Sequence, residues 1–209
     1  MKQSIYDIAI AAALAAGEKI LEVYHGEDFQ VSEKDDRSPL TLADRLAHDC
    51  ILGFLARTGL PVLSEEGRGI PYAERSDWET FWLVDPLDGT KEFIKRNGEF
   101  TVNIALVEKG VPIYGVVYAP VDRDLFVGKM NEGAWWLKDP GEEPVFETCR
   151  LKGEVLPLEQ EKKPGDAYKV VASRSHLNEE TLTFIKNIEE EQGTTELVTR
   201  GSSLKICMV

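Results

Sequence analysis

Two aspartates lie three residues apart in the segment WLVDPLDGT, residues 82–90. An apolar run leads into Asp85, a proline fixes the backbone at the next step, and Gly89 permits a conformation that a Cβ would resist. We therefore expect Asp85 and Asp88 on one tight turn, with the Leu87 carbonyl between them. Oxygen ligands of this kind suit a hard cation such as Mg²⁺, whereas zinc would favour the imidazole or thiolate that this segment lacks.

A third carboxylate comes from Glu65, which follows another short apolar run, residues 61–63. If both runs are buried strands, Glu65 closes the same cation site from a neighbouring strand. The plainer alternatives are a solvated turn at 85–89 and ordinary surface carboxylates at Glu65 and Glu66. The strand before the turn and Thr90 after it favour the cation site for the aspartates.

Composition limits the kinds of partner. The 209 residues carry 24 Lys+Arg against 37 Asp+Glu, a formal net charge of −13. A polymeric nucleic acid held by a basic surface is excluded, and a phosphate substrate would need a metal ion or a local arginine. Three widely spaced cysteines fit no disulfide framework and indicate a reducing, cytoplasmic location. The longest apolar stretch, residues 8–16, is shorter than the roughly 20 residues that cross a bilayer.

Two helices are predicted in the N-terminal part. Apolar residues recur at helical spacing over 5–24, and this continuity favours one amphipathic helix over a signal-peptide core. Residues 27–40 are polar and predict a loop or irregular hairpin. A second helix is expected over 41–58, with a capping signal at Thr41 and Asp44.

The rest of the chain changes from strand patterns to an α/β pattern. Alternation and turn signals predict an antiparallel meander over 102–107, 113–118, 125–127 and 134–137. The segment 139–166 is rich in Pro, Gly and charge and is the expected junction, although 145–151 could form a strand. A strand, a helix and a strand follow at 169–172, 178–191 and 196–199. We thus expect a metal-binding α+β domain over 1–138 and an α/β domain over 167–209.

Four segments together resemble the inositol monophosphatase superfamily of Mg²⁺-dependent, lithium-sensitive phosphatases: PLTLADR at 39–45, SEEG at 64–67, DPLDGT at 85–90 and GSSLK at 201–205. Inositol monophosphatases more often continue DGT with Thr-Asn-Phe. This chain has Lys91, Glu92 and Phe93 there, and the stretch from DGTKEF to PIYGVVYAP is similar to the 3'(2'),5'-bisphosphate nucleotidases. The resemblance implies a layered α/β (α+β) αβαβα sandwich, with a mainly antiparallel N-terminal sheet and an incomplete second α/β half.

The resemblance also implies roles for the acidic residues. Glu65, Asp85 and Asp88, with the Leu87 carbonyl, match ligands of two or three Mg²⁺ ions. Asp44 and Thr90 match the pair that orients and deprotonates the attacking water. Without the resemblance, Asp44 is explained as well by the helix dipole at the start of the second helix.

Substrate contacts are implied in three segments. The turn at 89–90 would bind the scissile phosphate, the 173–176 segment a second phosphate, and the 201–205 segment the nucleotide. Taken alone, His176 would be a surface residue, and its place beside two serines and an arginine makes a phosphate contact equally well supported. Lys34 resembles a lysine that some family members place near the attacking water. The full set expected around the substrate is Glu65, Leu87, Asp88, Gly89, Thr90, Ser173, Arg174, His176, Gly201 and Lys205.

The implied reaction is Mg²⁺-dependent hydrolysis of the 3'-phosphate of adenosine 3',5'-bisphosphate, giving AMP and phosphate in sulfur assimilation or nucleotide recycling. The alternatives are an inositol phosphatase or related sugar phosphatase, and a noncatalytic metal or nucleotide binder. A homodimer is compatible with each of them. The superfamily's later Trp-Asp motif has no counterpart before Val209. We therefore expect either an incomplete chain or a short form completed by a partner subunit.

Overall fold

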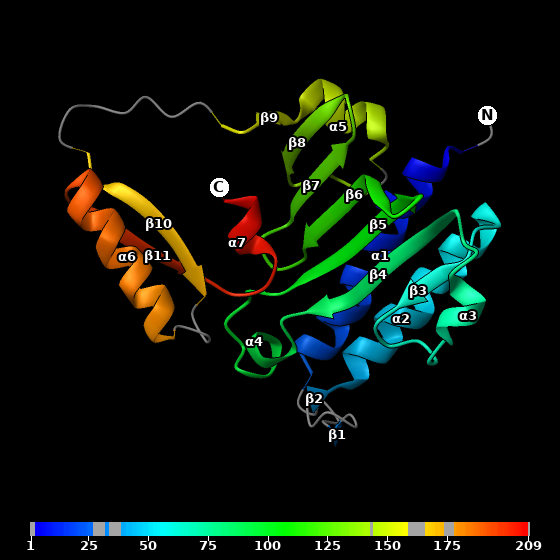
Figure 1. Ribbon diagram of the computed structural model, residues 1–209. Helices are drawn as coiled ribbons and strands as arrows, with labels where there is room; N and C mark the ends of the chain where they lie inside the picture. Colours follow the sequence, from blue (N-terminus) through cyan, green and yellow to red (C-terminus); the bar gives the residue numbers. More distant parts are fainter. Residues whose placement is uncertain are drawn as a thin grey trace.

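A seven-stranded mixed sheet forms the main body of the computed structural model, which describes residues 3–26, 32–33, 39–142, 144–158, 166–173 and 178–208 (Figure 1). The strand order is β3-β4-β5-β6-β7-β8-β9; β3 and β4 run parallel, and every other neighbouring pair is antiparallel. The strands are β3 (Val62–Ser64), β4 (Thr80–Asp88), β5 (Thr101–Glu108), β6 (Val111–Ala119), β7 (Asp124–Lys129), β8 (Gly133–Lys138) and β9 (Glu154–Leu156). The predicted meander is confirmed as β5 to β8.

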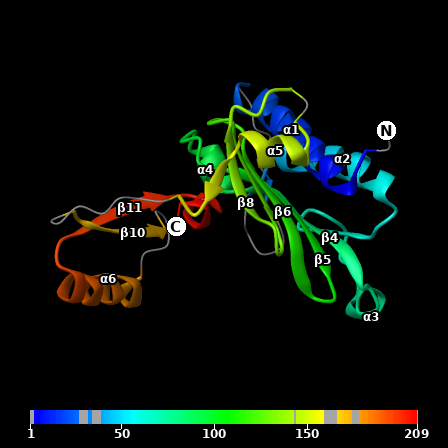
Figure 2. The ribbon, with the colours of Figure 1, turned by 90° about the horizontal axis from the view of Figure 1, so that it is seen from above.

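Two long helices cover one face of this sheet. Helix α1 (Ile5–Tyr24) and helix α2 (Leu42–Leu55, followed by a 3₁₀ turn at Ala56–Thr58) pack on each other and on β4, β5 and β6 (Figure 2). Their fully buried alanines let the helices approach the buried aromatic rings of the sheet, such as Trp82. Burial alternates along β4 and β5, as expected for a sheet with one covered face.

The opposite face of the sheet carries an acidic edge, which consists of Glu65, Asp85 and Asp88 at the ends of β3 and β4. Leu83 is 45% exposed there, and a groove of about 510 Å³ is lined by residues that include Glu65, Asp85 and Asn103. The carboxylates therefore lie on the side of the sheet away from α1 and α2. Short helices precede and follow this edge: α3 (Tyr72–Arg75) and α4 (Thr90–Ile94).

The segment expected to be a junction contains regular structure. Residues predicted as a possible strand at 145–151 form a helix instead, α5 (Phe146–Lys152), and β9 pairs with β8. Residues three apart lie on the same face of a helix, and Phe146 and Cys149 are both buried where α5 packs on β8 and α1. This shared burial favours the helix over the strand. The division into two domains stays a prediction, with the first sheet reaching Leu156.

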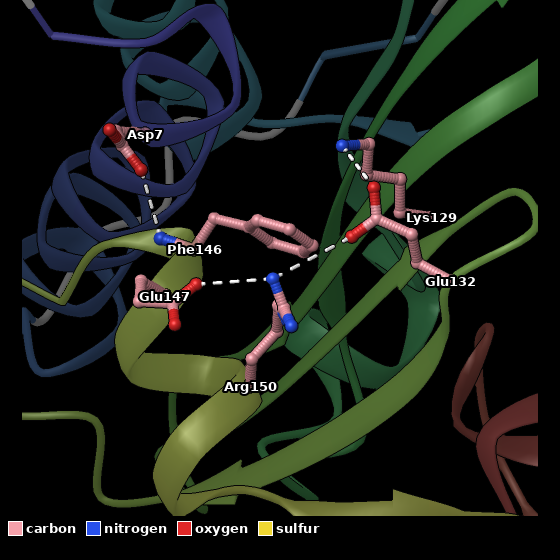
Figure 3. A network of polar contacts seen from close by, with 6 residues as sticks. All are labelled: Asp7, Lys129, Glu132, Phe146, Glu147 and Arg150. Carbon is pink, nitrogen blue, oxygen red and sulfur yellow. Dashed lines mark hydrogen bonds and ion pairs between the residues drawn. The ribbon is translucent and has the colours of Figure 1, made fainter.

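Polar contacts fix α5 to the first helix and to a hairpin (Figure 3). The Asp7 carboxylate caps α1 together with Ser4, and its Oδ1 accepts a hydrogen bond from the Phe146 backbone N–H at 2.9 Å. Arg150 reaches Glu147 on its own helix and Glu132 on the β7–β8 hairpin.

A smaller unit follows β9. Strands β10 (Tyr168–Ser173) and β11 (Thr195–Arg200) pair in parallel, joined by α6 (Glu179–Gln192), and a short helix α7 (Leu204–Cys207) comes last. This confirms the predicted strand-helix-strand pattern. In the 27–40 segment, β1 (Ser32–Glu33) and β2 (Pro39–Leu40) form an antiparallel pair, as expected for a hairpin; Lys34 lies outside the described residues.

Candidate active site

Three carboxylates lie at the end of the parallel pair β3–β4. Ser64 pairs with Val84, so Glu65 and Asp85 follow at the same edge, and the Glu65 N–H donates to the Val84 carbonyl at 3.0 Å. The expected tight turn at 85–88 is instead the end of β4, where the register against β5 shifts between Asp85 and Asp88. This irregularity resembles a bulge, which redirects side chains without ending the strand.

The Asp85 carboxyl group is electrostatically strained. Burial raises its pKa to about 8, and the negative charges of Glu65 and Asp88 and a side-chain hydrogen bond with Glu65 act in the same direction. The Leu87 N–H, which donates to Asp85 Oδ1 at 3.2 Å, opposes the rise only partly. A buried carboxylate beside two others is stabilised by a bound cation, so this edge suits a positive ion.

The strand facing these aspartates adds two polar atoms without partners. Thr101 is paired with Asp88 and Asn103 with Asp85, and within the described part of the chain Thr101 Oγ1 and Asn103 Oδ1 are buried without a hydrogen bond. Buried polar atoms of this kind call for a bound ion, water or ligand. An all-oxygen donor set fits a hard divalent cation.

The carboxylates are not arranged as a closed cluster. Among the residues that the structure describes, no group of three or more His, Cys, Asp or Glu side chains is close enough to hold a metal ion. Asp88 also has protein partners, because its Oδ2 accepts hydrogen bonds from the Ser203 N–H and hydroxyl, each at 2.6 Å.

Asp44 and Thr90 are brought together from α2 and α4. Asp44 is fully buried, and its Oδ2 accepts hydrogen bonds from the Thr41 N–H at 2.7 Å and the Thr41 hydroxyl at 2.5 Å. Its Oδ1 accepts from the Thr90 hydroxyl at 3.2 Å. The capping role and the contact with Thr90 therefore coexist, one on each carboxylate oxygen.

Gly89 makes the geometry of this turn possible. Its φ is +100°, and a Cβ would lie 3.0 Å from the Glu99 carbonyl oxygen. Gly89 precedes α4, so Thr90 begins a helix beside the acidic edge. The Thr90 hydroxyl also lies 3.3 Å from the Leu87 carbonyl oxygen, which places the turn, the carbonyl and Asp44 in one cluster.

The remaining expected substrate residues are less uniformly placed. Gly201 lies at the end of β11 against Glu99, and Ser173 ends β10 opposite Arg200. Lys205 turns its ammonium group onto the Ser202 carbonyl at 2.7 Å. Arg174 and His176 fall outside the described residues.

Sequence reasoning missed three polar residues around Asp88 and Gly201. Asn103 and Ser203 contact the Asp88 side chain, and Glu99, only 8% exposed, accepts the Gly201 N–H at 2.8 Å and pairs with Arg200 at 3.3 Å. A polar residue within the otherwise apolar pattern VNIALV was the available signal for Asn103. Nothing local marked Glu99, and Ser203 lies in the GSSLK segment that was expected to bind the nucleotide rather than to contact Asp88.

The layered α/β fold and its acidic edge define a phosphatase class, and residues 1–209 match the inositol monophosphatase family, to which the chain belongs. The chain is 44% identical over 197 residues to the 3'(2'),5'-bisphosphate nucleotidase CysQ of Salmonella typhimurium, covering 93% of this chain and 72% of that protein. The CysQ of Escherichia coli K12 matches with the same identity and coverage.

Solved structures agree with this assignment. The crystal structure of CysQ from Bacteroides thetaiotaomicron, described as a bacterial member of the inositol monophosphatase family, is 48% identical with a TM-score of 0.86. The match covers 100% of this chain and 76% of that one. SuhB of Bartonella henselae, at 24% identity and a TM-score of 0.72 over 98% of this chain and 73% of its own, shows the fold alone. In the described ranges, no helix has the length and apolar character needed to span a membrane.

Proposed function

We propose that the chain is a Mg²⁺-dependent 3'(2'),5'-bisphosphate nucleotidase that removes the 3'-phosphate of adenosine 3',5'-bisphosphate. The observation that carries this proposal is the crowded edge of Glu65, Asp85 and Asp88 beside the Asp44–Thr90 pair. Two relatives at 44% and 48% identity that carry the name CysQ support the choice of substrate over inositol phosphates.

Glu65, Asp85, Asp88 and the Leu87 carbonyl would hold two or three Mg²⁺ ions. When bound, the ions lower the pKa of the attacking water and neutralise the charge that develops on the phosphoryl group. The chain contributes the oxygen ligands and their spacing along β3 and β4. The raised pKa of Asp85 supports this assignment. It shows that the negative charge on this carboxylate is unfavourable without a positive partner, and a bound cation that displaces the proton supplies that partner.

Thr90 passes the proton of the attacking water to Asp44. Asp44 is 0% exposed, so its link to the site is the Thr90 hydroxyl, which donates to its Oδ1 at 3.2 Å. As the water attacks phosphorus, the Thr90 oxygen takes a proton from it and gives its own to Asp44. The bond between phosphorus and the 3' oxygen breaks, and the departing oxygen takes a proton from water to become the 3'-hydroxyl of AMP. Backbone donors at 89–90 bind the phosphoryl oxygens.

The proposed location is the cytoplasm. All three cysteines, Cys50, Cys149 and Cys207, are free, which supports a reducing compartment.

Parallel assays of phosphate release test the proposal. The full chain with Mg²⁺ is given adenosine 3',5'-bisphosphate or inositol 1-phosphate, with Asp88→Asn as the metal-ligand variant. We expect faster turnover of the nucleotide and loss of activity in the folded variant. Faster turnover of inositol phosphate would overturn the substrate assignment, and turnover of neither by metal-loaded protein would favour a binding protein.

A further inference from the structure

A short hydrogen-bond relay ends on one oxygen of Asp88. The backbone N–H and the hydroxyl of Ser203 both donate to Asp88 Oδ2, each at 2.6 Å. The Asn103 amide donates to the Ser203 hydroxyl at 2.9 Å and to the same Asp88 oxygen at 3.4 Å. Since the Ser203 hydroxyl accepts from Asn103, its own proton is directed to Asp88.

The relay joins parts of the chain that are far apart. Asp88 ends β4, Asn103 lies on the neighbouring strand β5, and Ser203 follows β11, 115 residues after Asp88. Ser203 is the N-terminal cap residue of α7. The first sheet and the smaller α/β unit therefore meet at the side chain of one acidic residue.

The corner that presents Ser203 is itself held in place. Ser202 has φ +48°, a conformation that residues other than glycine seldom adopt, and it reverses the chain just before Ser203. Gly201 donates its N–H to Glu99 Oε2 at 2.8 Å, and a Cβ there would lie 2.7 Å from Glu92 Cγ. These contacts leave the Ser203 N–H and hydroxyl little freedom to face elsewhere.

We propose that Ser203 and Asn103 are positioning residues that orient Asp88 for a divalent cation. They occupy Oδ2 and leave Oδ1 to face the ion. This inference rests on the proposed function in taking Asp88 as a metal ligand.

In this proposal, one oxygen of the Asp88 carboxylate binds protein donors and the other binds the ion. Within the described ranges, the hydrogen bonds to the Asp88 side chain all end on Oδ2. Partners on the outer oxygen of a metal-binding carboxylate fix its direction and tune its affinity, and their removal typically weakens metal binding about 10- to 100-fold. Because Ser203 belongs to the 201–205 corner, the position of this corner affects the orientation of Asp88 and hence the affinity for the cation.

Titration calorimetry of the full chain with MnCl₂, without substrate, measures the effect directly. We expect Ser203→Ala and Asn103→Ala to bind Mn²⁺ about 10-fold more weakly than the wild type. Ser203→Thr keeps the hydroxyl and should restore the affinity. Ser76→Ala removes an exposed hydroxyl at the end of α3, which donates to the Ala73 carbonyl at 3.2 Å rather than contacting Asp88, and should bind Mn²⁺ as the wild type does.

The Mg²⁺ dependence of hydrolysis separates positioning from loss of structure. Weakened Mn²⁺ binding with activity recovered at high Mg²⁺ supports the proposal. Wild-type affinity in both Ser203→Ala and Asn103→Ala, an equal loss in Ser76→Ala, or absence of Mn²⁺ binding to the wild type overturns it. Unfolding of both Ser203→Ala and Asn103→Ala overturns it as well. If the wild type binds Mn²⁺ and the variants weaken it but no bisphosphate is hydrolysed, the proposed function fails while the positioning role stands.

Discussion

The substitution Asp85→Asn should stabilise the metal-free protein while removing its capacity to bind a cation. The Asp85 carboxyl is buried, and the charges of Glu65 and Asp88 lie close by, so its pKa rises from 3.8 to about 8. The folded protein therefore resists ionisation of this group, whereas the unfolded chain ionises it freely. Asparagine keeps the shape of the side chain and cannot ionise in either the folded or the unfolded state.

The size of this effect follows from the pKa and the pH. Below pH 3.8 the carboxyl is protonated in both states and the substitution changes little. Above 3.8 the unfolded state gains from ionisation and the folded state does not, so the wild type loses stability as the pH rises towards 8. Each pH unit above 3.8 changes the free energy of unfolding by about 1.4 kcal/mol. At pH 7 and without metal, Asp85→Asn should therefore be more stable than the wild type by up to about 4 kcal/mol.

Urea denaturation in EDTA at pH 4, 5.5 and 7 measures the difference in unfolding free energy between Asp85→Asn and the wild type. Asp49→Asn, at an exposed position on α2, is the matched control and should change stability by less than about 0.5 kcal/mol. Adding Mg²⁺ should stabilise the wild type and leave Asp85→Asn unchanged. The reasoning would be refuted if the difference in unfolding free energy between Asp85→Asn and the wild type did not grow with pH. Equal stabilisation of the two proteins by Mg²⁺ would also refute it.

Three further substitutions test the rest of the site. Asp44→Asn retains a capping group but accepts no proton, so kcat should fall by about 10²- to 10⁴-fold with unchanged circular dichroism; activity near that of the wild type would exclude the proton route. Glu99→Gln weakens the acceptor for the Gly201 N–H and removes the ion pair with Arg200, so the free energy of unfolding in urea should fall by about 1–2 kcal/mol. Unchanged stability would show that these two contacts of Glu99 do not stabilise the fold. Gly201→Ala places a Cβ 2.7 Å from Glu92 Cγ and should lower the melting temperature, whereas Gly53→Ala, with no atom within 4 Å, should not; equal melting temperatures would contradict the packing.

The sequence predicted what depends on neighbouring residues. The capping pair of Thr41 and Asp44 and the backbone conformation of Gly89 are local features, because each is determined within one turn of chain. The meander followed from alternation along β5 to β8. The register that places Glu65 beside Asp85 followed only if the two apolar runs paired in parallel, which they do.

What the sequence did not predict depends on distant packing. Helix α5 was ambiguous because a seven-residue apolar pattern fits a strand or a helix until burial against α1 and β8 decides. The contact between Asp88 and Ser203 spans 115 residues, and no local pattern encodes it. The end of β4 was predicted as a turn, since a shifted strand and a turn share the same Pro and Gly signals.

The most direct test of the central claim is the product formed in ¹⁸O-labelled water. The full chain with Mg²⁺ is incubated with adenosine 3',5'-bisphosphate, and the products are identified by ³¹P NMR and mass spectrometry. We predict adenosine 5'-monophosphate without label and inorganic phosphate carrying one ¹⁸O, since water attacks the 3' phosphorus. Release of the 3'-monophosphate, label in the nucleotide, or no phosphate from metal-loaded protein would contradict the proposed activity.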